Sequence, residues 1–136
     1  MRDPLQDSTG YSLRRASNAM MAELAQRLTA VDLRMADATV LMLIEANPAI
    51  TASRIGRALD IQRANMVPLL KRLEDTGLVA RAPIDRKSLG LTLTEAGAAR
   101  LAEARAAIAS FEADLIARVP EPHRAHLLPA LDALWR

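Results

Sequence analysis

The change of sequence periodicity within residues 51–97 constrains the fold more than any other feature of the chain. Thr51 is suited to cap a helix, because its hydroxyl accepts hydrogen bonds from the free N–H groups of a first turn, and apolar residues then recur at helical spacing. The pattern breaks at Asp60-Ile61. The sequence therefore predicts a short helix that begins at Thr51 and is followed by a turn.

A second helical pattern starts at Gln62 or Arg63 and carries one narrow apolar stripe. The stripe consists of Met66, Leu69, Leu70 and Leu73. A helix of this kind packs by its stripe and presents its other face to a partner. Gly77 follows at the position where a glycine in the left-handed conformation ends a helix.

Two strand-like runs come next and enclose a charged turn. Residues 78–81 predict one strand, residues 89–93 predict its antiparallel partner, and residues 85–88 form the exposed turn between them. The complete order is helix, turn, helix and β-hairpin. This order is the plan of a winged helix-turn-helix domain, which reads DNA with its second helix.

A set of residues at fixed spacings in this region resembles the sequence motif of the multiple-antibiotic-resistance regulator (MarR) family. It consists of Leu73-Glu74-x-x-Gly77-Leu78-Val79-x-Arg81, then Asp85-Arg86-Lys87, and then Leu93-Thr94 and Gly97. The resemblance implies a mainly α fold with a small β-hairpin wing, in which N- and C-terminal dimerisation helices accompany a winged helix-turn-helix. It also implies a transcriptional regulator, usually a repressor, that spans residues 1–136 as a single domain.

Two positions depart from the family pattern. Lys87 stands where the family usually has an arginine that pairs with the aspartate of the wing, so we expect a wing tip that is held less rigidly. Pro68 lies inside the second helix, where it removes the backbone hydrogen bond to the carbonyl of Ala64 and is expected to bend the helix.

The composition favours closely packed helices over a large β core. Hydrophobic residues make up 51% of the chain, but they are mostly alanine and leucine, and aromatic residues make up only 2%. No cysteine is present, which excludes disulfides, thiolate metal sites and thiol redox sensing. No apolar run reaches the roughly 18 residues that a membrane helix needs, and the N-terminus lacks the apolar core of a secretory signal. We therefore expect a cytoplasmic protein.

Basic residues are concentrated in the predicted winged region. The net charge of the whole chain is only +2. Residues 54–87 contain eight basic and four acidic residues, whereas the rest of the chain contains ten basic and twelve acidic ones. The positive end of the molecule is therefore the predicted DNA-reading region.

Helical patterns also flank the winged region. Apolar residues recur at helical spacing over residues 11–29, 36–46 and 94–118, and a last helix is predicted to follow Pro122.

We assign residues 36–97 to a DNA-binding lobe and residues 1–35 and 98–136 to dimerisation. The outer helices carry more apolar surface than a small winged domain can cover. This surplus predicts a homodimer, whose two-fold symmetry requires a near-palindromic operator in double-stranded DNA.

Thirteen residues of the winged region are candidates for DNA contact. Gln62, Arg63 and Asn65 lie at the start of the second helix, and side chains of these types read base edges through hydrogen bonds. Arg86 and Lys87 at the wing tip suit the minor groove. The other candidates touch thymine methyl groups (Ala64, Val67 and Pro68) or bind phosphates (Thr51, Ser53, Arg54, Lys71 and Arg72).

A second candidate site lies on the first helix. Four of its residues are expected to face the cleft between the dimerisation helices and the DNA-binding lobe: Tyr11, Arg14, Arg15 and Ser17. The family resemblance implies that a small-molecule effector, such as an aromatic acid or its conjugate, binds there. The alternative is that these four residues form ordinary helix surface.

Metal binding and catalysis find little support in the sequence. His123 and His126 are three residues apart, a spacing that can bind a metal on a helix, but only Glu121 lies close to them, so we predict no metal site. Paired carboxylates, a glycine-rich phosphate loop and a nucleophile with a partner histidine are not recognisable. We therefore expect neither enzymatic activity nor a cofactor.

Two functional hypotheses follow. The first is a dimeric repressor whose effector changes the spacing of its two reading heads and thereby releases operator DNA. The alternative is a winged protein-interaction module that has lost DNA binding. Pro68 and Lys87 favour the alternative, whereas the charge distribution favours the repressor.

Overall fold

The computed structural model describes all 136 residues as six α-helices, one short 3-10 helix and two strands. In chain order these are α1 (Thr9–Thr29), α2 (Met35–Ala46), α3 (Ala52–Leu59), α4 (Arg63–Asp75), β1 (Val79–Pro83), β2 (Leu89–Leu93), α5 (Glu95–Arg118), η1 (Glu121–His123) and α6 (Arg124–Asp132). The predicted fold class, mainly helical with a small β-hairpin wing, is confirmed. No helix combines the length and the apolar character that crossing a membrane requires.

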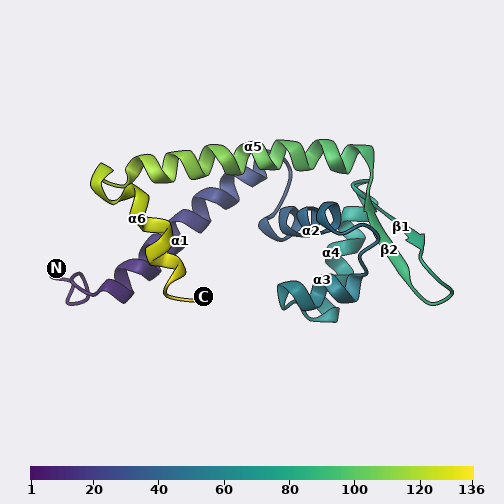
Figure 1. Cartoon of the computed structure of the whole chain (residues 1–136), viewed down its shortest axis with the longest axis horizontal. Coiled ribbons are helices and arrows are strands. Elements are labelled where there is room, and N and C mark those ends of the chain that lie inside the picture. Colours follow the sequence, from purple (N-terminus) through teal and green to yellow (C-terminus); the bar gives the residue numbers. More distant parts are fainter.

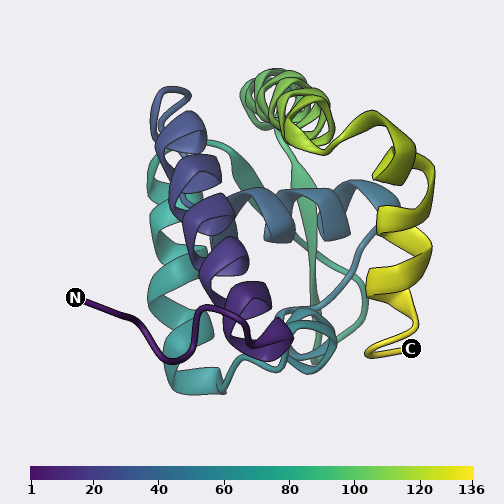
Figure 2. The same ribbon diagram turned by 90° about the vertical axis from the view of Figure 1, so that its left-hand side faces the viewer.

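Helix α5 runs along the long axis of the molecule and connects its two ends (Figure 1). Below one end of α5, helices α2, α3 and α4 and the hairpin form a lobe, and both termini lie at the other end. Figure 2 looks along the same axis and shows α1 and α6 on opposite sides. The first and last helices of the chain therefore do not cover each other.

The hydrophobic core lies where α2, α3, α4, the hairpin and the start of α5 meet. Leu41 on α2, Ile55 on α3 and Leu70 on α4 are almost completely buried in it. The apolar stripe predicted for the second helix is confirmed, because all four of its residues are buried. This packing turns the opposite face of α4 to solvent.

The predicted helix ends are confirmed. The Thr51 hydroxyl accepts a hydrogen bond from the N–H of Arg54 at 3.3 Å and caps α3, and Asp60 ends that helix in the left-handed conformation with φ of 52°. Gly77 adopts a φ of 75° just after α4. These two left-handed residues turn the chain from α3 into α4 and from α4 into the hairpin.

The hairpin is anchored at its base. Strands β1 and β2 are antiparallel, with Val79 opposite Leu93 and Pro83 opposite Leu89. The N–H of Leu91 donates to the carbonyl of Ile50 at 2.8 Å, which attaches β2 to the segment that leads into α3. The wing therefore extends from the lobe on a fixed base.

The first turn of α5 is joined to the lobe through the backbone. The N–H of Thr94 donates to the carbonyl of Leu78 at 3.1 Å, and the Thr94 hydroxyl donates to the carbonyl of Gly77 at 2.5 Å. Gly97 lies against the same Leu78 carbonyl, so closely that a Cβ atom at position 97 would stand 1.9 Å from its oxygen. Only a residue without a side chain fits at this joint.

Ion pairs hold the other half of α5 to α1. The Arg27 guanidinium lies 2.8 Å from Glu23 and 2.6 Å from Asp114, and Arg118 also lies 2.8 Å from Glu23. Hydrogen bonds from Arg118 and Arg27 lower the pKa of Glu23. Helix α5 is thus attached to the lobe at its start and to α1 further along.

The C-terminal segment contributes nothing to the core. No residue of α6 is buried, and the large apolar side chains of Leu128, Leu134 and Trp135 are 65%, 68% and 72% exposed. Leu13 and Met21 on α1 are also exposed. Within a single chain, these outer helices leave an apolar surface uncovered.

Candidate nucleic-acid interface

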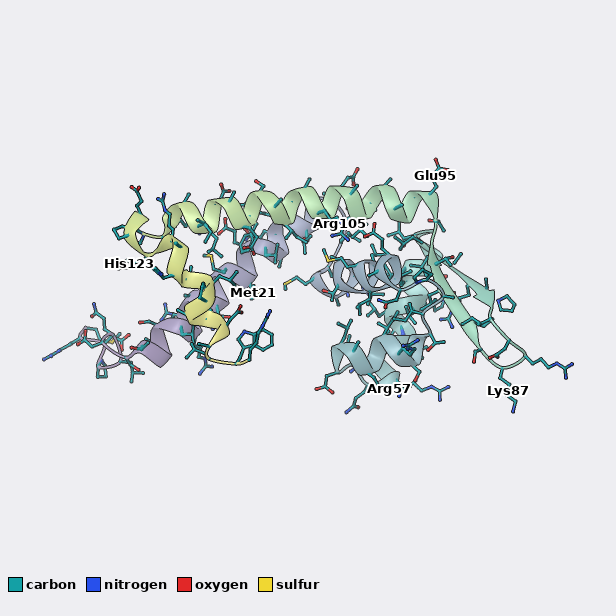
Figure 3. The ribbon with its side chains drawn as sticks, viewed as in Figure 1. Met21, Arg57, Lys87, Glu95, Arg105 and His123 are labelled. Atoms are coloured by element: carbon teal, nitrogen blue, oxygen red, sulfur yellow. The ribbon has the colours of Figure 1, made fainter.

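A cleft with a volume of about 760 Å³ lies between α3, α4 and the wing. Four basic side chains and one acidic side chain line it: Arg57, Arg63, Arg81, Lys87 and Asp60. Figure 3 shows Arg57 and Lys87 at the edge of the molecule that faces away from α5. A basic cleft of this kind attracts a polyanion such as DNA.

The first turn of α4 presents polar side chains beside this cleft. Gln62, Arg63 and Asn65 are all exposed. The Gln62 side chain makes no capping hydrogen bond, so its amide is available to a partner. Met66, one position further on, is buried and anchors the same turn in the core. The predicted base-reading residues therefore lie together on a supported helix end.

The other predicted contact residues of α3 and α4, with one exception, surround this turn on exposed or partly exposed positions: Thr51, Ser53, Arg54, Ala64, Val67, Pro68 and Lys71. Thr51, Ser53 and Val67 line the cleft itself. Lys71 donates to Asp75 at 2.7 Å on the solvent side of α4, and this hydrogen bond raises the pKa of Lys71.

Arg72 is the exception because it is paired inside the lobe, although it too is partly exposed. Its guanidinium donates to the buried carboxylate of Asp37 on α2, and it lines a separate pocket rather than the basic cleft. The Arg72 side chain is nevertheless 35% exposed, so phosphate binding by Arg72 stays a prediction beside this pairing inside the lobe. The two residues are 35 positions apart, so no local pattern in the sequence indicates the pair.

Two cleft residues were missed by the sequence reasoning. Arg57 follows Ser53 by one helical turn on α3 and donates to its hydroxyl at 3.4 Å. Arg81 lies on β1, and its Nε lies 2.7 Å from a carboxylate oxygen of Glu74 on α4. The spacing of Arg57 from Ser53 was a usable signal, whereas the position of Arg81 depends on how the hairpin packs against α4.

The wing tip is held by its aspartate through backbone contacts. One carboxylate oxygen of Asp85 accepts hydrogen bonds from the N–H groups of Lys87 and Ser88, both at 2.8 Å. These bonds lower the pKa of Asp85. In place of the side-chain pair that the family pattern has at position 87, Asp85 makes contacts with backbone N–H groups, which any residue there can supply. The side chains of Arg86 and Lys87 remain exposed.

We expect the turn at the wing tip to loosen only when the pH falls below 3.8, the ordinary pKa of an aspartate. Because the folded-state pKa is lowered, the carboxylate contributes its full stabilisation above the unfolded value and loses it as the pH falls through the folded value. The NMR shifts of the Lys87 and Ser88 amide protons should titrate with a midpoint below 3.8. The same amides in Asp85→Asn serve as the control and should show no such step; a midpoint at or above the ordinary value would contradict the expectation.

Pro68 does not divide the second helix. Helix α4 is continuous from Arg63 to Asp75, although Pro68 lacks the N–H that would bond to the carbonyl of Ala64. Pro68 is exposed, so its ring adds apolar surface on the side of α4 that faces away from the core.

The candidate effector residues lie on the N-terminal half of α1, which extends away from the lobe (Figure 1). The Tyr11 hydroxyl accepts from Arg15 at 2.9 Å, while Arg14 and Ser17 are exposed. They line neither the basic cleft nor the pocket beside Arg72. Within one chain, these four residues are therefore separate from both of these pockets.

The two histidines fall in different elements. His123 is the last residue of η1, and His126 lies on α6. Nowhere in the structure do three side chains of histidine, cysteine, aspartate or glutamate come together in a way that could hold a metal ion.

The fold and the cleft together define a class of protein. A helix-turn-helix presents polar side chains at the start of its second helix, a basic hairpin flanks it, and long helices outside the lobe are left with apolar faces. This combination is that of a winged-helix DNA-binding transcriptional regulator.

Comparison with known proteins gives the family. The MarR family model matches residues 31–88, from the connection before α2 to the wing tip. The transcriptional repressor CouR is 34% identical and superposes with a TM-score of 0.79 over 96% of this chain and 93% of its own. The chain belongs to the MarR family of transcriptional regulators.

Other relatives are also transcriptional regulators. The structure of CouR bound to a 23-mer DNA duplex is 32% identical, with a TM-score of 0.83, and the match covers 100% of this chain and 100% of that one. The structure of CouR bound to p-coumaroyl-CoA is also 32% identical, with a TM-score of 0.84, and the match covers 100% of this chain and 97% of that one. A putative transcriptional regulatory protein for the hcr operon of Thauera aromatica is 29% identical over 93% of this chain and 78% of that protein. The repressor Rv2887 of Mycobacterium tuberculosis is 27% identical over 92% and 91%, and a structure of Rv2887 with salicylic acid has a TM-score of 0.73 at 26% identity, covering 95% of this chain and 97% of that one.

Proposed function

We propose that this MarR-family regulator represses transcription by binding a near-palindromic operator as a homodimer, and that a small aromatic acid or its coenzyme A thioester releases it. The observation that carries the proposal is the exposed polar first turn of α4 beside a basic cleft, in a chain that matches the DNA-bound form of CouR along its whole length.

The uncovered outer helices support the homodimer. Residues 1–35 and 98–136 would form the dimerisation region, and residues 36–97 would form the DNA-binding lobe. Leu128 and Trp135 are more exposed than apolar side chains of this size usually are, and a second copy of the chain would cover them. A two-fold axis through this region would place two α4 helices about one turn of DNA apart.

We assign the DNA contacts by position on the lobe. Gln62, Arg63 and Asn65 would read base edges in the major groove, and Arg86 and Lys87 would border the minor groove. The remaining contacts would go to thymine methyl groups or to phosphates: Ala64, Val67 and Pro68 for the methyl groups, and Thr51, Ser53, Arg54, Arg57 and Lys71 for the phosphates.

The effector class rests on the relatives. CouR has been solved with p-coumaroyl-CoA and Rv2887 with salicylic acid, and both ligands join an aromatic ring to an acid or to its thioester. In this chain Tyr11, Arg14, Arg15 and Ser17 offer an aromatic ring, two cations and a hydroxyl on α1, which suits such a ligand once the partner protomer closes the site. The effector would favour a spacing of the two α4 helices that does not fit the operator.

Selection of bound sequences from random duplex DNA, at two salt concentrations, tests the proposal. We expect an enriched inverted repeat, because two symmetric reading heads require one. A reader that neutralises about six phosphates should lose roughly 10³-fold in affinity between about 50 and 200 mM salt. Adding p-coumaroyl-CoA or salicylate to the operator complex should then raise its dissociation constant.

A winged protein-interaction module is the alternative. It would enrich no sequence, and any weak DNA binding would be equally weak for all duplexes. Enrichment of a single half-site without its inverted repeat would instead contradict the homodimer.

A further inference from the structure

Asp37 is the one charged side chain buried in the structure, with 3% of its surface exposed. It lies in the first turn of α2, where one carboxylate oxygen accepts the N–H of Arg34 at 2.8 Å. Its other oxygen accepts a hydrogen bond from the guanidinium of Arg72, in the last turn of α4. A single carboxylate therefore joins the start of α2 to the far end of the DNA-reading helix.

We propose that Asp37 is a positioning residue for DNA reading: acting through Arg72, it fixes the orientation of α4 and so sets how well the protein distinguishes its operator from other DNA, without touching DNA itself. This inference rests on the proposed function, because it assumes that α4 reads an operator.

The packing of α4 explains why such a fixed point is needed. The buried face of the helix consists of Met66, Leu69, Leu70 and Leu73. Each contact between apolar side chains is non-directional, so such packing restricts the roll and tilt of the helix less sharply than a directional bond does. A charged hydrogen bond is short and directional, and Arg72 makes one to a carboxylate that α2 already holds.

Because Arg72 lies far from the first turn of α4, a small tilt of the helix at Arg72 produces a larger displacement at the DNA-reading residues. Arg63 and Arg72 are nine residues apart, which is about 13 Å along a helix axis. A tilt of about 5° near Arg72 moves the first turn of α4 by about 1 Å. A displacement of this size is enough to spoil a hydrogen-bonded site, which needs its groups placed to within about 0.5 Å.

A second tie holds the opposite flank of α4. Glu74, two residues after Arg72, pairs with Arg81 on β1 at 2.7 Å. The end of α4 is therefore held from α2 on one side and from the wing strand on the other. The two pairs differ in burial, because Asp37 is buried whereas Glu74 and Arg81 are each about one third exposed. Salt therefore screens the Asp37 pair less than the other.

Stability alone does not account for a buried carboxylate here. Removing two charges from water largely offsets their attraction, so a buried ion pair is a weak net stabiliser. Replacing a buried ion pair by apolar side chains of similar volume is often neutral or stabilising. The Asp37–Arg72 pair adds a directional hydrogen bond to the apolar packing between α2 and α4.

Asp37→Asn is the decisive variant, because the asparagine carbonyl can still accept the N–H of Arg34 while the charge that holds Arg72 is lost. Asp32→Asn is the matched control: it removes an equal charge from the same pocket beside Arg72, at an exposed residue whose left-handed conformation asparagine tolerates. The measured quantity is the ratio of the affinities for the selected operator and for a random duplex, together with the thermal unfolding midpoint of each variant.

We expect Asp37→Asn to lower this ratio by about tenfold or more, the size of one lost base contact, and Asp32→Asn to leave it within about twofold. Charge alone predicts an unchanged ratio, because removing a negative charge strengthens binding to the operator and to random DNA alike. The double variant that combines Asp37→Asn with Arg72→Gln should have an affinity ratio no lower than that of Arg72→Gln alone, because the two residues act as one unit. If Asp37→Asn does not fold, Arg72→Lys should show a smaller fall in the same ratio at near-normal stability.

An unchanged ratio in Asp37→Asn, or an equal fall in Asp32→Asn, would overturn this inference and leave the proposed function standing. If the unsubstituted protein enriches no sequence at all, both the proposed function and this inference are overturned. The two failures are therefore distinguishable.

Discussion

Gly97→Ala should lower the free energy of unfolding by about 3 kcal/mol or more. A methyl group at position 97 would stand 1.9 Å from the Leu78 carbonyl oxygen and 2.9 Å from its carbon, and both are backbone atoms that cannot rotate away. Relief requires the first turn of α5 to move off the lobe, which strains the hydrogen bond from Thr94 to the same carbonyl. The loss is a large part of the stability of about 5–15 kcal/mol that is typical of a domain.

Gly10→Ala is the matched control for this substitution. Gly10 also lies in the first turns of a helix, but a Cβ atom there would meet nothing within 4 Å. Alanine at position 10 should therefore stabilise the protein by about 0.5–1 kcal/mol, through its higher helix propensity. Thermal or urea unfolding at one fixed protein concentration measures both, because unfolding of a dimer depends on concentration. Equal effects of the two substitutions would contradict the role assigned to the joint.

Arg63→Ala should have the largest effect on DNA recognition. Arg63 is the first residue of α4, is exposed and lines the basic cleft. An arginine that reads guanine through two hydrogen bonds contributes about 1–3 kcal/mol of discrimination, so its loss should flatten base preference at one position of each half-site. Repeating the selection with Arg63→Ala measures this directly.

Arg86→Ala is the comparison, because it removes the same charge from the wing tip, away from α4. It should weaken binding to all sequences to a similar extent and reduce the dependence on salt by about one phosphate contact. A selection profile for Arg63→Ala that matches the unsubstituted protein would remove Arg63 from the base-reading residues.

Most of the fold follows from local signals in the sequence. The four apolar residues of α4 recur with helical period and are all buried, and Thr51 caps the helix that it was predicted to cap. Such signals work because a helix end must satisfy its free N–H groups within a few residues, and because an amphipathic helix has only one face to bury. The placing of Gln62 and Arg63 at one helix end follows from the same periodicity.

Contacts between residues that are distant in the sequence could not be predicted from local patterns. Arg72 looks like any other basic residue on α4 until α2 brings Asp37 against it. In the sequence, Gly97 is one residue of a helical segment and of the family motif. Only the close approach of the Leu78 backbone shows why a side chain is excluded at this position. Arg81 enters the cleft because β1 lies beside α4. Each of these depends on segments that are distant in the sequence.

The attachment of α5 at both of its ends bears on the DNA that this protein can recognise. Helix α5 has 24 residues and is about 36 Å long, close to one turn of DNA, and it connects the lobe at Gly97 to the ion pairs around Arg27. A rod fixed at both ends transmits distance faithfully. In the proposed homodimer, this attachment would link the distance between the two lobes to the packing of the outer helices, so a change in the number of base pairs between half-sites should weaken binding.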